Sequence, residues 1–200
     1  ELYSGHNTAA PASSPEELWQ LALTLEAAIR AAEPAIVSSE VTIHEVQLSQ
    51  RLVSSEGADA ESASRAIVAA VSAQANFNGF ACGTEFELTA SSPDGFDPAA
   101  IAATAAERLR LQGPPVPFTP GPYRVFLDQP VIWNILLTAW QMFSGPRCEA
   151  GTSCFAGKLG EPVGSPLVTL SDYPPHPACG YKYDFDFEGT PCSPIALMRE

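Results

Sequence analysis

A proline-rich segment at residues 113–122 divides this chain into two parts. The segment reads GPPVPFTPGP and holds five prolines in ten positions. Proline has no backbone N–H and a fixed φ, so such a segment cannot form a helix interior or a central strand. We therefore predict an ordered connector at 114–122, between a helix-and-sheet layer at 1–113 and a region at 123–200 that holds a helix and glycine- and proline-punctuated β structure.

The first part opens with a helix-start signal. Ser14 is followed by a proline and two glutamates, which is the order of a capping residue, a first-turn proline and acids favoured by the helix dipole. Apolar residues then recur at helical spacing until Pro34. A second amphipathic helix is predicted at 99–111, capped by Asp97 and started by Pro98.

Three strands are expected between these helices. Residues 41–52 form an extended, β-branched run that ends in the turn-like SSEG at 54–57. Residues 67–75, whose alanines make the prediction ambiguous, and 77–89 are two further strands, with Asn78-Gly79 as a hairpin signal. A short strand at 123–127 and a third helix from Asp128 follow the connector. The composite is an α+β fold with antiparallel sheet layers and two or three helices packed on one face.

The charge balance argues against nucleic acid as a partner. The chain has 23 acidic and 10 basic residues, a formal charge of −13 at pH 7, whereas nucleic-acid binding relies on clustered lysine and arginine. A membrane is not expected as a partner either. The most apolar segment, 131–143, is interrupted by polar residues and is much shorter than the roughly 20 apolar residues of a spanning helix.

Cysteine and arginine usage favour a bacterial cytoplasm. The five cysteines form no CxxC pair, and their odd number leaves one unpaired in any full disulfide scheme. This pattern fits a reducing compartment better than a secreted framework. Eight of the ten basic residues are arginine and alanine is abundant, a composition typical of a GC-rich bacterial genome.

Three glycine-containing motifs follow one another along the chain. They are SSEG at 54–57, GTSCFAGKLGE at 151–161 and DFDFEGTP at 184–191. In order and approximate spacing they resemble the TldD/PmbA family, some of whose members are zinc peptidases that act on peptides and peptide antibiotics. The resemblance implies a TldD/PmbA-like fold. Family members also carry a domain before and a sheet-rich half after the matching region, so we expect either a partner chain that covers the open sheet edges or a longer parent protein.

The zinc motif of those peptidases is missing. In them, a helix before the FAGKLGE-like loop carries HExxxH, and counting back from Phe155 places the three ligand positions on Leu136, Leu137 and Gln141. Zinc needs nitrogen, sulfur or carboxylate donors, about three of them in a catalytic site. No metal or other cofactor is therefore expected, and the chain resembles the PmbA/TldE-like half of the family rather than a zinc peptidase.

The third helix and the glycine-rich loop carry the predicted substrate-binding residues. Asn134, Thr138 and Gln141 fall at i, i+4 and i+7 and share one helix face. This polar stripe either faces the former active-site cavity or belongs to a buried helix whose polar groups bond to nearby backbone. In the loop, Lys158 could hold a carboxylate, and Phe155 is the other predicted substrate-binding residue. Ligand contact and plain loop architecture both stay open there.

The predicted catalytic residues lie further along the chain. A strand at 181–188 would place Asp184, Asp186 and Glu188 on one face, with His176 just upstream. This group could act in general acid/base catalysis, with His176 and Asp186 as the first choices for a base, or bind a hard cation. A solvated acidic strand face is the plainer interpretation. Cys154 is a candidate nucleophile, although a buried structural cysteine is favoured because no histidine is near it in sequence.

Three possible functions follow from these observations. The first is a metal-free subunit that pairs with a TldD-like chain, as a heterodimer or homodimer, and forms a substrate cavity for peptide or peptide-antibiotic processing. The chain would then belong to a heteromeric hydrolase or cyclase. The alternative is a natural-product biosynthetic enzyme that performs metal-independent hydrolysis, elimination or ring closure on a small molecule. A binding protein without chemistry is the third possibility.

Overall fold

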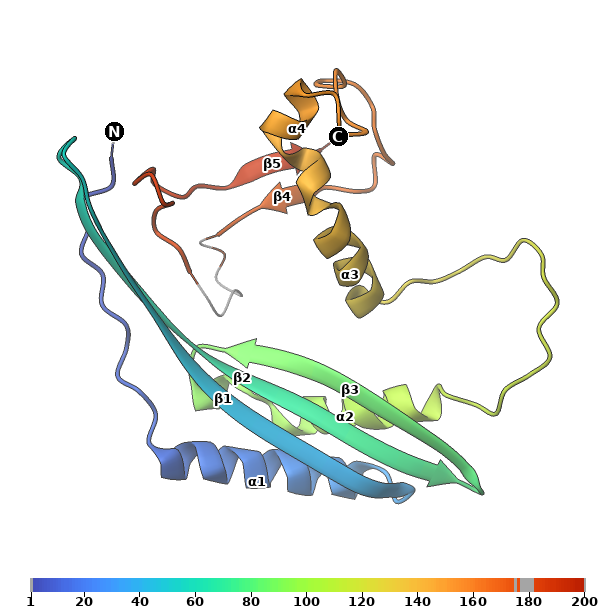
Figure 1. Cartoon of the computed structure of the whole chain (residues 1–200). Helices are drawn as coiled ribbons and strands as arrows, with labels where there is room; N and C mark the ends of the chain where they lie inside the picture. Colours follow the sequence, from blue (N-terminus) through green and yellow to red (C-terminus); the bar gives the residue numbers. More distant parts are fainter. Residues whose placement is uncertain (1, 175, 177–181, 200) are drawn as a thin grey trace. The chain divides into compact units, whose positions relative to one another are not determined.

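The chain forms two compact units in the computed structural model, which describes residues 2–174, 176 and 182–199 (Figure 1). Unit 1 consists of Glu1–Val116 and Tyr173–Ser193, and unit 2 of Pro117–Asp172 and Pro194–Glu200. The connector at 113–122 has neither helix nor strand.

Helix α1, Pro15–Ala32, begins where the sequence predicts. The Ser14 hydroxyl accepts the Glu17 N–H at 3.2 Å, and the Glu17 carboxylate accepts the Ser14 N–H at 2.7 Å. This reciprocal pair is a capping box, which satisfies backbone donors that the first helical turn leaves open. The buried face of α1 carries Leu21, Leu25 and Ile29, which lie one above another at intervals of four residues.

Unit 1 contains a three-stranded antiparallel sheet in the order of the chain. Its strands are β1, Ile36–Val53, β2, Asp59–Phe77, and β3, Phe80–Ala90. The turn between β2 and β3 places Asn78 and Gly79 at φ values of 55° and 92°, as a two-residue hairpin of the primed type requires. All three predicted strands are confirmed. β1 and β2 extend beyond the predicted 41–52 and 67–75 because they pair with each other along nearly their whole length, whereas β3 begins at Phe80 rather than at residue 77, since the Asn78-Gly79 turn precedes it.

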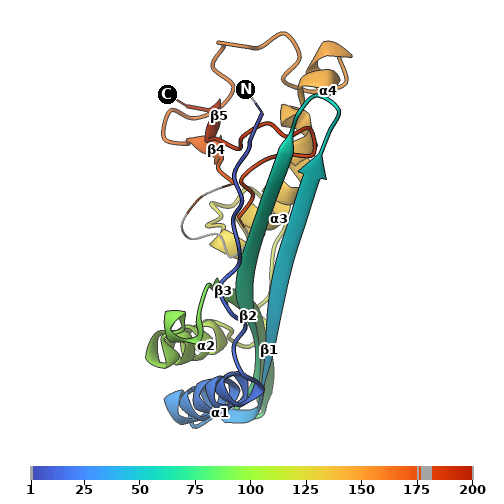
Figure 2. The ribbon, with the colours of Figure 1, turned by 90° about the vertical axis from the view of Figure 1, so that its left-hand side faces the viewer.

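Both helices of unit 1 cover the same side of this sheet (Figure 2). Helix α2, Pro98–Arg110, starts at Asp97, whose carboxylate accepts the N–H groups of Ala99 and Ala100 at 2.9 and 3.2 Å. The two helices and the inward-facing residues of β2 form the core of the unit. Its largest fully buried side chains are Leu25, Ile29, Ile67, Val71 and Leu109.

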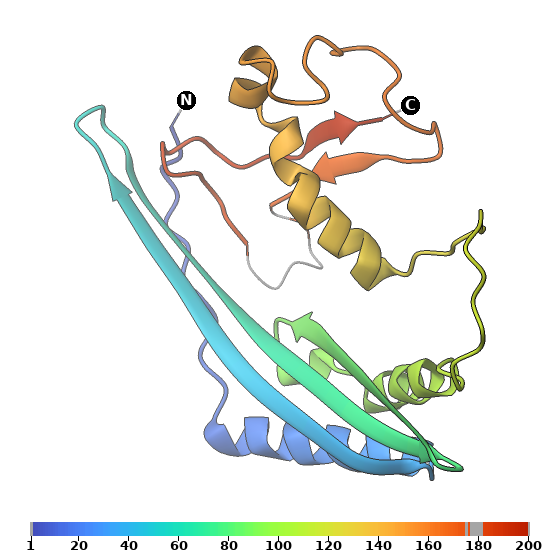
Figure 3. The same ribbon diagram turned by 45° about the vertical axis from the view of Figure 1, so that its right-hand side comes forward.

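Two segments from opposite ends of the sequence pack on the half of the β1–β2 hairpin that lies near its turn. The N-terminal segment runs beside β2, where Asn7 N–H donates to the Glu61 carbonyl at 2.9 Å (Figure 3). The returning segment 182–193 contributes Phe185, which is buried and stacks on Tyr3 with ring centroids 5.2 Å apart. The backbone carbonyl of Phe185 accepts a hydrogen bond from Gln50 Nε2 at 3.2 Å. The two ends of unit 1 therefore share a second, smaller apolar cluster.

The predicted strand at 181–188 is wrong for its described part, 182–188. Phe185 makes one isolated bridge to Pro191, and a turn follows at once. The Asp186 carboxylate accepts the N–H groups of Glu188 and Thr190 at 2.9 and 2.8 Å, and Gly189 has a φ of 85°. An aspartate that bonds to backbone two residues on, followed by a left-handed glycine, closes a turn and ends any strand.

Unit 2 contains short elements joined by irregular segments. Its helices are α3, Gln129–Ala139, the 3₁₀ helix η2, Trp140–Phe143, and α4, Gly145–Glu149, and its strands are β4, Leu170–Asp172, and β5, Ile195–Met198. The predicted start of the third helix is confirmed, since the Asp128 carboxylate accepts the Gln129 N–H at 2.7 Å. The strand expected at 123–127 is wrong, because this exposed segment pairs with no other described strand.

Within the described residues, no helix has the length and the apolar run that crossing a membrane requires.

Candidate functional site

Glycines determine the path of the loop at 151–161. Gly151, Gly157 and Gly160 have φ values of 69°, 70° and 82°, in the left-handed region that other residues rarely adopt. Between them the chain makes two successive turns: Lys158 N–H donates to the Phe155 carbonyl, and Glu161 N–H donates to the Lys158 carbonyl, both at 3.0 Å. The loop is therefore ordered by its own backbone.

Ser153 attaches this loop to the end of the α3–η2 segment. Its side chain is buried and donates to the Met142 carbonyl at 2.5 Å, while its hydroxyl oxygen accepts the Phe155 N–H at 3.0 Å. The rings of Phe143 and Phe155 stack with centroids 4.8 Å apart. One buried hydroxyl and one aromatic pair thus fix the loop relative to η2.

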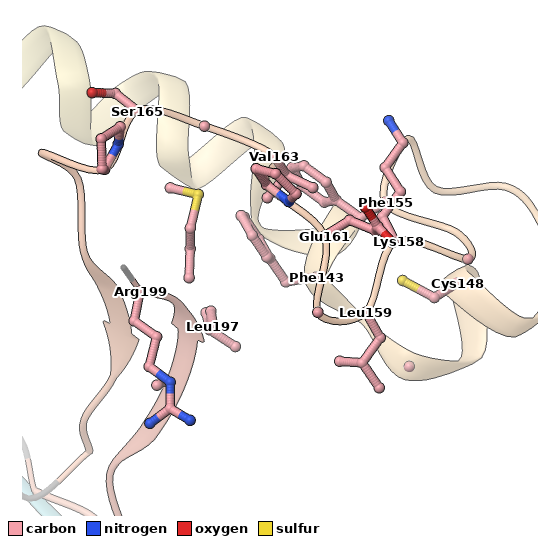
Figure 4. Close-up of a pocket in the computed structure, with 18 of the residues that line it drawn as sticks. Phe143, Cys148, Phe155, Lys158, Leu159, Glu161, Val163, Ser165, Leu197 and Arg199 are labelled. Atoms are coloured by element: carbon pink, nitrogen blue, oxygen red, sulfur yellow. The ribbon is translucent and has the colours of Figure 1, made fainter.

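The loop, α4 and β5 line an open pocket of about 1160 Å³ within unit 2 (Figure 4). Much of its lining is apolar and includes Phe143, Phe155, Leu159, Val163 and Leu197. Lys158 and Glu161 lie on the loop side of the pocket, and Arg199 lies on the strand side. An apolar lining with a few charged groups at its margin suits an apolar group that carries a carboxylate or amide.

Two of the predicted binding residues, Phe155 and Lys158, line this pocket. The polar residues of α3 are placed differently. Asn134 Nδ2 donates to the Pro130 carbonyl at 2.8 Å, and Thr138 Oγ1 donates to the Asn134 carbonyl at 2.9 Å. Both side chains therefore bond to the backbone of their own helix. The interpretation of α3 as a buried helix is nevertheless wrong, because none of its residues is buried. Gln141 follows in η2 and is exposed.

The positions of the family's zinc ligands do not fit a metal. Leu136 is half-buried, and Leu137 and Gln141 are exposed. Two hydrocarbon side chains and an amide supply no donor set for zinc. Across the described ranges, moreover, no three His, Cys, Asp or Glu side chains are grouped so as to hold a metal ion.

The carboxylates near the end of unit 1 do not share a strand face. Asp184 accepts hydrogen bonds from the buried Ser62 hydroxyl at 2.6 Å and from Asn7 Nδ2 at 3.2 Å. Asp186 instead caps its own turn, where the Thr190 N–H, with help from Glu188 N–H, holds the pKa of the Asp186 carboxyl below its ordinary value. These contacts give both carboxylates structural roles.

The other candidates for chemistry have different surroundings. The His176 ring packs edge-on against the Tyr173 ring, with centroids 5.1 Å apart, and the backbone N–H of His176 donates to the Tyr173 carbonyl. Cys154 is exposed, so the expectation of a buried structural cysteine is wrong. It follows the buried Ser153 at the start of a turn.

The sequence patterns do not predict the pocket residues that lie on β5 and just after it. Leu197 and Arg199 reach the pocket because β5 pairs with β4, and Phe143 reaches it through the Ser153 hydrogen bonds. No local pattern relates 195–199 to a loop about forty residues earlier. The short apolar run of β5 is the one signal that could have indicated a strand there.

Family models and solved structures both match this chain. The model described as PmbA/TldA metallopeptidase central domain matches residues 10–112, and the C-terminal domain model of the same description matches residues 120–200. The fold is α+β with antiparallel sheets. No curated protein matches the chain significantly. The chain belongs to the PmbA/TldD metallopeptidase family.

Three solved structures share its fold. A candidate modulator of a DNA gyrase from Thermotoga maritima MSB8 has 21% identity and a TM-score of 0.82, over 100% of this chain and 48% of that one. TldE from Thermococcus kodakarensis has 21% identity and a TM-score of 0.75, over 94% and 43%. A candidate modulator of DNA gyrase from Bacteroides thetaiotaomicron VPI-5482 has 16% identity and a TM-score of 0.73, over 99% and 47%. The chain thus spans about half the length of these relatives.

Proposed function

We propose that this chain is a metal-free, PmbA/TldE-like subunit that pairs with a TldD-like chain bearing HExxxH. Together the two would form a substrate cavity for peptide or peptide-antibiotic processing. The observation that carries the proposal is the residue set at the zinc positions, Leu136 and Leu137 on α3 and Gln141 on η2, in the segment that precedes the FAGKLGE loop.

The ordered FAGKLGE loop supports a role of this chain in substrate binding, rather than a loss of all function together with the zinc ligands. Its left-handed glycines, the buried Ser153 and the Phe143–Phe155 stack preserve a defined conformation beside a pocket. A loop without function would have no need of such an arrangement. The metal chemistry would then come from the partner, and this chain would supply the wall that positions an extended substrate.

The contacts of Asp186 do not favour the alternative of a metal-free biosynthetic enzyme. A general base works best with a pKa near the operating pH, whereas backbone N–H groups lower the pKa of this carboxyl. The Glu188 and Thr190 N–H groups both donate to Oδ1 of Asp186 and fix this carboxylate in its own turn. We therefore expect the Asp186→Asn substitution to weaken the turn and lower the stability of the fold, without a specific effect on catalysis.

The test is to produce the chain alone and together with a TldD-like chain that bears HExxxH, and to measure bound zinc and peptide hydrolysis in both preparations. We expect the isolated chain to bind no stoichiometric zinc and to cleave no peptide. The complex should cleave peptides, and a Glu→Gln change in the partner's HExxxH should abolish this activity. Stoichiometric zinc and turnover in the isolated chain would overturn the proposal.

A further inference from the structure

The loop that lines the pocket of unit 2 is anchored at both of its ends. At its start, the buried Ser153 hydroxyl donates to the Met142 carbonyl at 2.5 Å, and the Phe155 ring stacks on an aromatic ring of η2. At its other end, Gly164 lies against β5, where an added Cβ would come within 3.0 Å of Met198 Sδ. The loop therefore connects η2 to β5, and the pocket between them is formed without a ligand, as binding sites usually are.

Leu159 is the residue of this loop that gains most from a ligand. It lines the pocket and yet is fully exposed. It stands between Gly157 and Gly160, and no atom lies within 4 Å of the position that a Cβ would take at either glycine. An exposed leucine lacks the stabilisation that burial gives to a leucine in a core. An apolar group placed in the pocket against Leu159 would provide that burial.

The backbone of the same turn offers hydrogen-bond donors. The N–H groups of Gly157, Leu159 and Gly160 make no hydrogen bond within the described part of the chain. Backbone N–H groups need an acceptor, and in peptide recognition such groups bind the main chain while pockets select the side chains. Apolar lining beside free backbone donors therefore favours a peptide over a lipid chain, because a peptide carries a carbonyl next to every side chain.

The charged side chains around the pocket balance one another. Lys158 and Arg199 are basic, Glu149 and Glu161 are acidic, and none of the four forms an ion pair with another described residue. Their charges sum to zero, so the lining attracts neither an anion nor a cation by net charge. The group that suits the pocket is thus an uncharged, apolar side chain.

We infer that this pocket is a subsite for one large apolar side chain of a peptide, and that Leu159 determines its preference. Leu159 contacts this side chain from the loop and Leu197 contacts it from β5 (Figure 4). The free N–H groups of the turn at 157–160 bind the neighbouring peptide carbonyls. The inference rests on the proposed function for the peptide nature of the ligand and deepens it, because it names the class of substrate residue that this chain selects.

The first test is the binding of two short peptides to the isolated chain. The probes are acetyl-Gly-Phe-Gly-amide and acetyl-Gly-Ser-Gly-amide, which are uncharged and differ in one side chain. We expect the Phe peptide to bind at least about tenfold more tightly than the Ser peptide, because only its side chain gains from burial. In NMR spectra of the isotope-labelled chain, it should shift the amide signals of 157–164 and 196–199.

The second test compares two leucine substitutions within unit 2. Leu159 and Leu167 are 103% and 93% exposed, but Leu167 does not line the pocket. Leu159→Ser should weaken binding of the Phe peptide about fivefold or more, whereas Leu167→Ser should change it by less than about twofold. Both side chains are exposed, so both variants should keep the unfolding temperature of the wild type.

Equal affinity of the wild type for the two peptides would overturn the subsite inference. Equal affinities of the two variants for the Phe peptide would overturn the role of Leu159, and so would signal shifts confined to residues outside the pocket. None of these measurements involves a second chain, so each of these results would leave the proposed pairing intact. A chain that binds the Phe peptide as expected but never associates with an HExxxH-bearing chain would instead overturn the proposed function.

Discussion

The Arg65 guanidinium and the Glu45 carboxylate form a buried ion pair across the β1–β2 hairpin, with Nε 3.5 Å from Oε1 and side chains only 9% and 10% exposed. Glu45 also accepts the Ser13 N–H at 3.0 Å. Arg65 donates to the Pro11 carbonyl and to the Ser91 carbonyl, the latter at 3.1 Å. This pair therefore holds the N-terminal segment and the end of β3 on the same side of the hairpin.

Replacing Glu45 by Ala should destabilise unit 1 strongly. The change leaves a buried guanidinium without its counter-charge, which typically costs about 3–5 kcal/mol. Arg51→Ala is the matched control, because the Arg51–Asp59 pair is equally close, at 3.3 Å, but exposed; its loss should cost less than about 1 kcal/mol. Urea unfolding of the three proteins measures the difference. Equal stabilities for the two variants would show that burial of the Glu45–Arg65 pair has no energetic weight.

Gly79→Ala should destabilise the β2–β3 hairpin by about 1–2 kcal/mol, because a Cβ is unfavourable in the left-handed region. No atom lies within 4 Å of the position that this Cβ would take, so the cost comes from the backbone and not from a clash. Gly113→Ala is the control, since it too meets open space but lies at no positive φ. Thermal unfolding should separate the two variants, and a Gly79→Ala protein as stable as the control would refute the turn geometry.

The free energy of unfolding should decrease at acidic pH, in part because the Glu33 carboxylate becomes protonated. The Ala35 N–H at 3.1 Å and then Arg110 Nε at 2.5 Å lower the pKa of the Glu33 carboxyl below its ordinary value of 4.5. Because this pKa is lower in the folded chain than in the unfolded chain, the ionised Glu33 carboxylate stabilises the fold. This stabilisation is fully present at pH values above the pKa of the unfolded state, and it is lost as the pH falls through the pKa of the folded state. Glu33→Gln should therefore be less stable than the wild type at neutral pH, and the difference should shrink below about pH 4.5. Urea midpoints measured across this range give the comparison; a difference that grows in acid would reverse the assigned sign.

Removing metal should leave the isolated chain unchanged. No donor set occupies the zinc positions on α3 and η2, so dialysis against a chelator should alter neither the unfolding temperature nor the circular dichroism. A relative that carries HExxxH serves as the positive control under the same conditions. A marked fall in the unfolding temperature of this chain would indicate a metal site elsewhere in it.

Local signals predict the helix starts of both units and the β2–β3 hairpin of unit 1. Ser14, Asp97 and Asp128 were identifiable as helix caps because each satisfies backbone donors within three residues of itself. Asn78-Gly79 likewise specifies its hairpin by backbone conformation alone. Such features depend on neighbours in sequence, so single-sequence reasoning finds them.

The errors concern structure that depends on distant partners. Alternation at 123–127 and 181–188 predicted strands, but a strand needs a paired neighbour, and Asp186 and Gly189 close a turn instead. The pocket was missed for the same reason, since Arg199 and Phe155 come together only through the β4–β5 pairing. Burial on α3 was overestimated, because its apolar residues have no covering element in the described structure.

The central claim is tested most directly by the native mass and zinc content of this chain co-produced with a TldD-like chain that bears HExxxH. Light scattering after size-exclusion chromatography gives the mass, and elemental analysis of the same fraction gives the metal. We predict an equimolar complex whose zinc disappears when the partner's HExxxH is mutated, while the complex itself persists. Two separate peaks, with stoichiometric zinc in the fraction that holds this chain alone, would contradict the account.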